Sequence, residues 1–210
     1  MDKSIENEIT VKTNAQVNMG NWISRGWDMT FSDIGPIILI SFIYLVVIAV
    51  ASSTLIGEFV VIGPLNVGFF FLFFKKIRGQ KIDIGDIGRG FSFFVAAVLS
   101  QIIISVFVSI GFIFCIIPGI VVSALYIFAP ALIVEKKLDF WQAMEASRKI
   151  VSHYLFEMSI FVIVLGFINL LGVLLCGVGV LISIPITFGA MAAAYDDLVG
   201  IENEAAETAD

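Results

Sequence analysis

The chain contains six long apolar runs that carry no lysine or arginine. A helix needs about 20 mostly apolar residues to cross the hydrocarbon of a bilayer, and each central Leu, Ile, Phe or Val favours insertion. With 59% hydrophobic and only 14% charged residues, the composition lies far from that of soluble domains. We therefore predict an all-α integral membrane protein with six transmembrane helices. The runs are 34–55, 59–74, 93–115, 117–134, 155–176 and 178–195.

The run 59–74 is the shortest of the six and carries Pro64 in its first turns. Proline is tolerated near a helix start because its missing N–H would have no partner there. We predict a complete span for this run, with a re-entrant segment as the alternative.

The twelve lysines and arginines fall into three clusters. One precedes the first run, one lies between the second and third, and one lies between the fourth and fifth. The connections after the first, third and fifth runs carry none. By the positive-inside rule, the N-terminus, both basic connections and the C-terminus are predicted to lie in the cytoplasm.

The sequence shows internal similarity at a spacing of about 60 residues, the kind of period that marks repeat architectures. A shift of 61 places 114–120 over 175–181 and the basic pair 75–76 over 136–137. Each unit holds two runs joined by a short turn, which predicts a helical hairpin. We divide the chain into a polar, disordered N-terminus (1–19), a membrane domain (20–199) of three hairpin repeats (20–80, 81–138 and 139–199) and an acidic tail (200–210).

Each repeat is predicted to begin with an amphipathic helix at the membrane surface. In the third repeat, Asp139 and Gln142 fit a capping pair, and Glu145 precedes Arg148 by three residues, the favourable order for an ion pair. Such a helix suits the interface, with apolar side chains at the acyl boundary and cations among anionic headgroups. The alternative is that these helices only pack against the ends of the spans. The side chains on the predicted apolar face are Phe140, Met144, Ser147, Val151 and Tyr154.

Residues that carry enzyme chemistry are scarce. His153 is the one histidine, so a multi-histidine metal site cannot form. The stretch 83–90 is rich in glycine but lacks the known phosphate-loop patterns, and we interpret it as a flexible, weakly helical linker. We therefore predict no enzymatic activity, no cofactor, and no catalytic, cofactor-binding or metal-binding residues.

Four polar side chains fall inside the predicted spans. We interpret Asn66, Gln101 and Asn169 as interhelical hydrogen-bonding groups. Glu157 lies two residues inside the fifth run, where it can reach the headgroups, and a functional role for it is the alternative.

Cys115 and Cys176 take matching positions near the predicted outer face. We interpret them as two free thiols that act as small apolar residues. A disulfide between them is the alternative, because an oxidising compartment would permit one.

One stretch resembles a known family. The string "IPGIVVSALYIFAPALIVEKKLDFWQAMEASRKIV" (117–151) is similar to a motif of uncharacterised bacterial inner-membrane proteins of the YciC type. It also resembles the membrane domain attached to some glycerophosphodiester phosphodiesterases. The resemblance implies a protein of the bacterial cytoplasmic membrane and transfers no active site, because the chain lacks the acid and histidine cluster of the phosphodiesterase.

These observations lead to three functional hypotheses. We expect a non-enzymatic multi-pass protein that supports the membrane or envelope through contacts with lipid, with another copy of itself or with another membrane protein. The alternative is a small-molecule transporter or channel with a path between the repeats, suggested by glycine and proline in the return runs. A lipid-modifying enzyme is the third, resting on His153, Glu157 and the interfacial basic residues. No nucleic-acid partner is expected.

Overall fold

The computed structural model describes residues 17–54, 57–175 and 178–201, and this part of the chain forms helices and no strand. Six of its helical stretches are long and apolar enough to cross a membrane. The prediction of an all-helical chain with six such stretches is therefore confirmed. The helices in chain order are α2 (Met19–Ser32), α3 (Ile34–Ala51), α4 (Gly57–Ile77), the 3-10 helix η1 (Ile84–Phe93), α5 (Phe94–Phe114), α6 (Ile116–Leu125), α7 (Ala129–Glu135), α8 (Phe140–Ser152), α9 (Leu155–Leu174) and α10 (Val180–Leu198).

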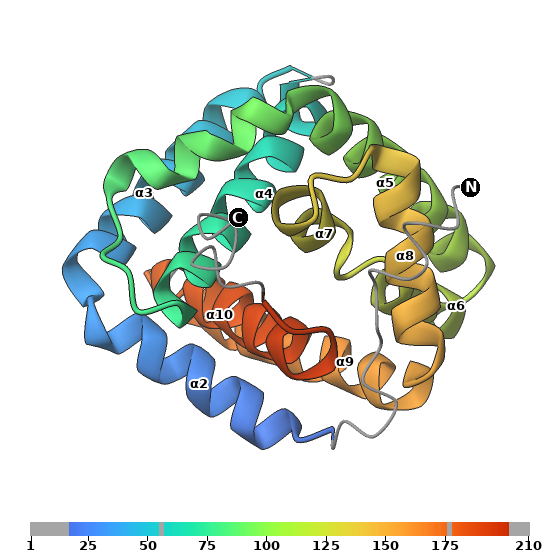
Figure 1. Ribbon diagram of the computed structural model, residues 1–210. Helices are drawn as coiled ribbons and strands as arrows, with labels where there is room; N and C mark the ends of the chain where they lie inside the picture. Colours follow the sequence, from blue (N-terminus) through green and yellow to red (C-terminus); the bar gives the residue numbers. More distant parts are fainter. Residues whose placement is uncertain (1–16, 55–56, 176–177, 202–210) are drawn as a thin grey trace, which may run out of the picture.

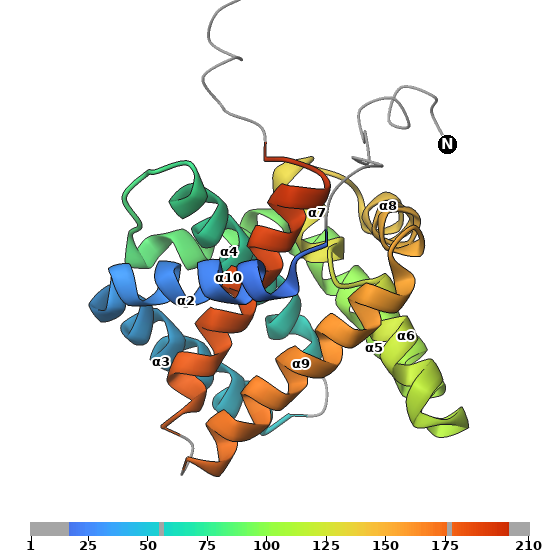
Figure 2. The same cartoon turned by 90° about the horizontal axis from the view of Figure 1, so that it is seen from below.

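Each hairpin combines an exposed helix with a more buried one. Figure 1 shows α4, α7 and α10 toward the centre of the molecule, with the other helices around them. More than half of the apolar part of α4 and of α10 is buried, whereas less than a quarter is buried in the spans that contain α3, α5 and α9. We call α4, α7 and α10 the inner helices, and α3, α5 and α9 the outer helices. In Figure 2 the end of α5 and α6 lies apart from the ends of α3 and α9, on the side of the molecule where the hairpin connections lie.

Aromatic side chains fill the space between the inner helices. Phe69 of α4 stacks on Phe188 of α10, with ring centroids 4.7 Å apart. Tyr195 of α10 lies 5.2 Å from the ring of Phe74 and 5.7 Å from that of Phe128, the residue that precedes α7. All five rings are buried. Aromatic pairs at such distances add to the packing of large apolar surfaces, so the centre is held by ring contacts.

Glycine lets two further helices approach the inner ones closely. A Cβ atom on Gly26 of α2 would lie 2.6 Å from the backbone nitrogen of Ala190 in α10. A Cβ atom on Gly90 of η1 would lie 1.8 Å from the carbonyl oxygen of Pro64 in α4. A larger residue at either place would force the two backbones apart, so the packing of α2 on α10 and of η1 on α4 depends on glycine.

The stretch 83–90 departs from the flexible linker that we expected. It forms the start of η1, which packs against α4 and buries Asp86, Ile87 and Gly90. The N–H of Gly85 donates to Asp83 Oδ1 at 2.8 Å, and the N–H of Asp83 donates to Asp86 Oδ2 at 2.7 Å. This reciprocal capping by Asp83 and Asp86 starts the helix despite the three glycines of the stretch.

The fourth predicted span, 117–134, is confirmed as a stretch long and apolar enough to cross a membrane (Ile116–Glu135), but its helix is interrupted at residues 126–128. Helix α6 ends at Leu125 and α7 begins at Ala129. Pro130 has no N–H, and its ring would clash with the carbonyl four residues earlier, so an unbroken helix is disfavoured there. Ser147 of α8 covers the break: its hydroxyl donates to the Leu125 carbonyl at 2.7 Å and accepts from the Phe128 N–H at 3.2 Å.

The boundaries of three other segments differ from the predicted ones. The first span ends at Ala51, four residues earlier than predicted. The second is one helix of 21 residues that continues through Pro64, so its length suffices for a complete crossing. Helix α2 begins at Met19, where the Asn18 side chain accepts the N–H of Asn21, before the predicted boundary at 20. The rest of the predicted disordered N-terminus (1–16) and most of the acidic tail (202–210) lie outside the described residues.

Candidate functional site

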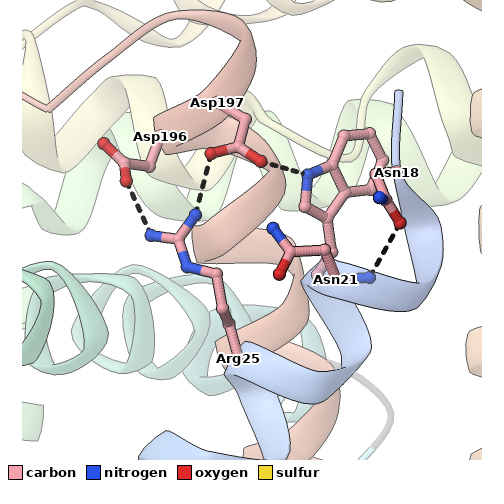
Figure 3. A network of polar contacts seen from close by, with 6 residues as sticks. Asn18, Asn21, Arg25, Asp196 and Asp197 are labelled. Carbon is pink, nitrogen blue, oxygen red and sulfur yellow. Dashed lines mark hydrogen bonds and ion pairs between the residues drawn. The ribbon is translucent and has the colours of Figure 1, made fainter. Parts of the chain in front are cut away.

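Arg25 of α2 lies between two aspartates near the end of α10 (Figure 3). Its Nη1 donates to Asp197 Oδ1 at 2.8 Å, and its Nη2 donates to Asp196 Oδ2 at 2.7 Å. The indole N–H of Trp22 donates to Asp197 Oδ2 at 2.7 Å. These bonds join the first and the last described helix, and each carboxylate engages a charge-assisted donor.

A second group of ion pairs surrounds the end of α4. Asp86 and Glu135 are almost fully buried there, with side chains 7% and 4% exposed. Removing the cation from a buried pair costs about 3–5 kcal/mol, because the remaining charge stays buried without compensation. The pairs therefore tie η1 and α7 to α4. The three pairs are Lys75–Asp86, Lys76–Asp33 and Arg78–Glu135.

We call these residues together the ion-paired end of the bundle. They lie at the ends of the inner helices, before α3, and on α2 and η1. Each charge lies within hydrogen-bond distance of an opposite one, four cations facing five carboxylates, an arrangement that fixes helices in place. The members are Arg25, Asp33, Lys75, Lys76, Arg78, Asp86, Glu135, Asp196 and Asp197.

Two of the predicted intramembrane polar residues meet. Asn66 of α4 donates from Nδ2 to Gln101 Oε1 of α5 at 3.3 Å, and its Oδ1 accepts from the Tyr44 hydroxyl of α3 at 3.1 Å. Gln101 in turn donates to Ser105 at 3.1 Å. The chain of bonds connects three helices, as expected for polar groups that satisfy one another in hydrocarbon.

The other two predicted residues lie apart from this network. Asn169 of α9 donates to Thr187 Oγ1 of α10 at 2.7 Å, and its Oδ1 accepts from Ser183 at 3.1 Å. It therefore joins α9 to α10 within the third hairpin. Glu157, half-exposed in the first turn of α9, makes no ion pair or hydrogen bond with another residue of the described part.

Helix α8 carries the predicted pairs. Gln142 Oε1 accepts from the Asp139 N–H at 3.3 Å, and Arg148 donates to both oxygens of Glu145 at 3.1 and 2.7 Å. The hydrogen bond from Arg148 lowers the pKa of Glu145. A lowered pKa means that the pair's contribution is complete above the ordinary carboxyl pKa and is lost as the pH falls through the lowered one. His153 lies at the exposed end of this helix, with Nδ1 2.8 Å from the carbonyl oxygen of Lys149.

The predicted apolar face of α8 meets protein. Met144, Ser147 and Val151 are buried, and α8 packs against α5, α6 and α7. The side chain of Trp141 is exposed instead. The burial of Met144, Ser147 and Val151 agrees with the alternative interpretation, in which the helix packs against the ends of the spans.

The thiols and the acids give little material for a reactive centre. Cys115 is exposed and its thiol is free. Cys176, the other member of the alternative disulfide, lies outside the described residues. Across the described ranges, His, Cys, Asp and Glu side chains do not gather in groups of three that could hold a metal ion.

No protein-family model, curated protein or solved structure matches the chain. Its function must therefore be argued from the geometry alone. Sequence reasoning named the four polar residues of the spans but missed the ion-paired end. A signal was present, because a shift of 61 places Lys75 and Lys76 over 136–137, and a shift of 60 places 136–137 over Asp196 and Asp197, so charged pairs close equivalent runs.

Proposed function

We propose that the protein is a non-enzymatic, multi-pass protein of the bacterial cytoplasmic membrane that supports the envelope through contacts with lipid and with other membrane proteins or a second copy of itself. The observation that carries the proposal is the engagement of its polar groups with one another. The charged side chains of the ion-paired end form ion pairs with one another. The amides of Asn66, Gln101 and Asn169 form hydrogen bonds within the bundle. The space between the inner helices is occupied by aromatic rings. Such an interior suits a fixed scaffold.

The proposed architecture is a ring of three hairpin repeats. Support comes from the order of contacts: α4 packs on η1, α7 on α8, and α10 on α2. Each inner helix thus meets the helix that leads into the next hairpin, and the third returns to the first. An ion pair joins α4 to η1 (Lys75–Asp86), and another joins α10 to α2 (Asp197–Arg25). The two pairs take corresponding places in this order, with the charges reversed. In this arrangement α2, η1 and α8 form a collar at the cytoplasmic surface, where exposed Lys81 and Lys137 would meet anionic headgroups.

The orientation is tested with reporters fused to each end of the chain. We expect a reporter that works only in the cytoplasm to be active at both ends, because the basic clusters and the ion-paired end lie on one side. Activity at one end alone would refute the six-span arrangement.

The role is tested by deleting the gene in the source bacterium. The deletion is expected to increase the release of a cytoplasmic enzyme after osmotic downshift, and expression of the wild-type chain should bring the release back to its normal level. The double variant His153→Ala/Glu157→Gln should restore normal release equally well, because these side chains serve no chemistry in a scaffold. Failure of this variant alone, while it reaches wild-type levels in the membrane, would favour the lipid-modifying enzyme.

A transporter is the second candidate, favoured by one observation, the break between α6 and α7 inside a span. Broken helices line substrate sites in many transporters. Here Ser147 occupies the open backbone groups, so transport would require α8 to move away. Release of trapped ions or sugars from vesicles that contain the pure protein, abolished by Asn66→Leu, would replace the scaffold proposal by this one.

A further inference from the structure

Two of the three hairpin connections are built from exposed apolar side chains. In the second hairpin, residues 112–118 are exposed without interruption, and Ile113 and Phe114 are each 82% exposed. In the third, residues 173–175 and Val178 are exposed, with Leu174 at 69%. We call these segments the apolar tips. Water is a poor solvent for such surfaces, so something apolar must cover them.

Charge is absent along the chain around both tips. The nearest charged residues to the tip of the second hairpin are Arg89 and Glu135, which both lie at the opposite end of its helices. The corresponding residues for the third hairpin are Glu157 and Asp196. A span that emerges into water usually ends in polar or charged residues, and these spans do not.

The backbone of the second hairpin turns with very little irregular structure. Cys115 is the single residue between α5 and α6; its N–H donates to the Gly111 carbonyl at 3.1 Å, and its carbonyl accepts from Gly119 at 3.4 Å. Pro118 brings no N–H that would need a partner. A Cβ atom on Gly111 would lie 2.9 Å from Gly119 Cα, so the two glycines let the helices come together directly behind the turn. A turn with so few open polar groups is compatible with an apolar surrounding.

The first hairpin differs at every one of these points. Helix α3 is followed by Ser52, Ser53 and Thr54, which are exposed and whose hydroxyls donate to backbone carbonyls at 2.7–3.1 Å. Glu58 follows in the sequence. This connection has the polar composition of a loop that reaches water.

We infer that the two apolar tips end at the outer edge of the hydrocarbon in the leaflet opposite the ion-paired end, so that the spans still cross it, with lipid acyl chains as the partner of the tips, while the connection of the first hairpin contacts water. The inference rests on the proposed membrane insertion and adds a depth to each hairpin. The exposed apolar surface of the tips continues that of α5 and α9, with Val106 and Ile110 on one and Leu170 and Leu171 on the other. Acyl chains cover such a surface without requiring a complementary polar group.

The depth of each tip is measured with a nitroxide label on a single cysteine. Cys176→Ser leaves Cys115 as the probe of the second tip. With Cys115→Ser also introduced, Val178→Cys probes the third tip, and Ser53→Cys provides the matched control on the first. The chains are labelled in detergent and placed in vesicles of phosphatidylethanolamine and phosphatidylglycerol. Collisions with oxygen, which concentrates in hydrocarbon, are then compared with collisions with a water-soluble nickel chelate.

We expect the ratio of oxygen to nickel collisions to be about tenfold higher at Cys115 and at Val178→Cys than at Ser53→Cys, because the chelate does not enter the hydrocarbon. Equal nickel collisions at all three positions would place the tips in water and overturn the inference. Few collisions with either reagent at the tips would mean that protein covers them, which also overturns it.

The same preparations separate this failure from a failure of the proposed function. A low nickel value at Ser53→Cys, with high oxygen, would put all three connections in hydrocarbon and contradict the six-span insertion itself. A high nickel value at Ser53→Cys together with high nickel values at both tips would leave the six spans intact and reject only the lipid-buried tips.

Discussion

The inner and outer helices are both apolar enough to cross a membrane, yet they occupy different surroundings. Less than a quarter of the apolar part is buried in the spans that contain α3, α5 and α9, whereas α4 and α10 bury more than half of theirs, and α7 is buried throughout its middle. Apolar side chains cannot explain the difference, because a lipid tail is as apolar as a leucine. What distinguishes the inner helices is the quality of their packing, which is the main force between helices in a bilayer.

The glycines show this contrast residue by residue. A Cβ atom on Gly63 or Gly68 of the inner helix α4 would lie 2.3 or 2.1 Å from a neighbouring carbonyl oxygen. A Cβ atom on Gly35 of α3 or Gly166 of α9 would meet nothing within 4 Å. Glycine thus serves as a contact surface at Gly63 and Gly68 of the inner helix and as an empty position at Gly35 and Gly166 of the outer ones.

The largest effect is expected from removing an inner aromatic ring. Phe188→Ala should lower the free energy of unfolding by about 3–5 kcal/mol, because it empties the space between Phe69 and Phe70. Phe167→Ala on the exposed face of α9 is the control and should change it little. Both values are measured by titrating the protein in mixed micelles with a denaturing detergent. Equal losses would abolish the distinction between inner and outer helices.

A somewhat smaller loss is expected where the inner helices are joined by charge. Arg78→Met should cost about 3 kcal/mol, because the carboxylate of Glu135 stays buried without its ion pair. The double variant Arg78→Met/Glu135→Leu should recover most of this loss, since no charge remains buried. If the double variant is as unstable as the single one, the pair is not what ties α4 to α7. The same micelle titration supplies the measurement.

Gly68→Ala and Gly166→Ala should act in opposite directions. The first places a methyl group against the Ile87 carbonyl of η1 and should destabilise by about 1–3 kcal/mol. The second fills open space in a helix and should stabilise by up to about 1 kcal/mol, the difference in helix propensity. Unfolding titrations of the two variants test the comparison directly, and a loss in both would show that the outer helices also depend on close contacts.

The smallest effect is expected from the intramembrane amides. Asn66→Leu should cost about 1 kcal/mol, because it removes hydrogen bonds to Tyr44 and Gln101. In the Gln101→Leu background the same change should cost less, since their common bond is already lost. A cost that is unchanged in that background would mean that the two amides do not interact.

Much of this fold follows from the sequence for simple reasons. Long apolar runs without cations have few alternatives to a membrane helix, and their lengths fall close to the observed ones. Pairs at short spacing, such as Glu145 with Arg148, depend only on helix geometry and were predicted correctly. The break before Pro130 was missed although the proline itself marks it, because the surrounding composition still fitted a continuous span.

The sequence marks charged pairs at the ends of equivalent runs, but it does not show which residues of the ion-paired end contact one another. Arg25 and Asp197 lie 172 positions apart, and nothing local identifies one as the partner of the other. Asn66 and Gln101 were both recognised as bonding groups, but their pairing depends on how α4 and α5 face each other. Asp196 and Asp197 fall within the predicted membrane domain (20–199), and nothing next to them in the sequence identifies Arg25 as their partner. Partner choice, unlike helix formation, is decided by the packed bundle.

The contact of α2 with α10 has a consequence for how the protein is made. A ribosome delivers Trp22 and Arg25 long before it delivers Asp196 and Asp197, so during translation the early helix waits at the membrane with its donors unmatched. A chain interrupted before α10 would keep these groups uncovered, and quality-control proteases could recognise the unfinished product by them. The contact between α2 and α10 can therefore form only after α10 has been made.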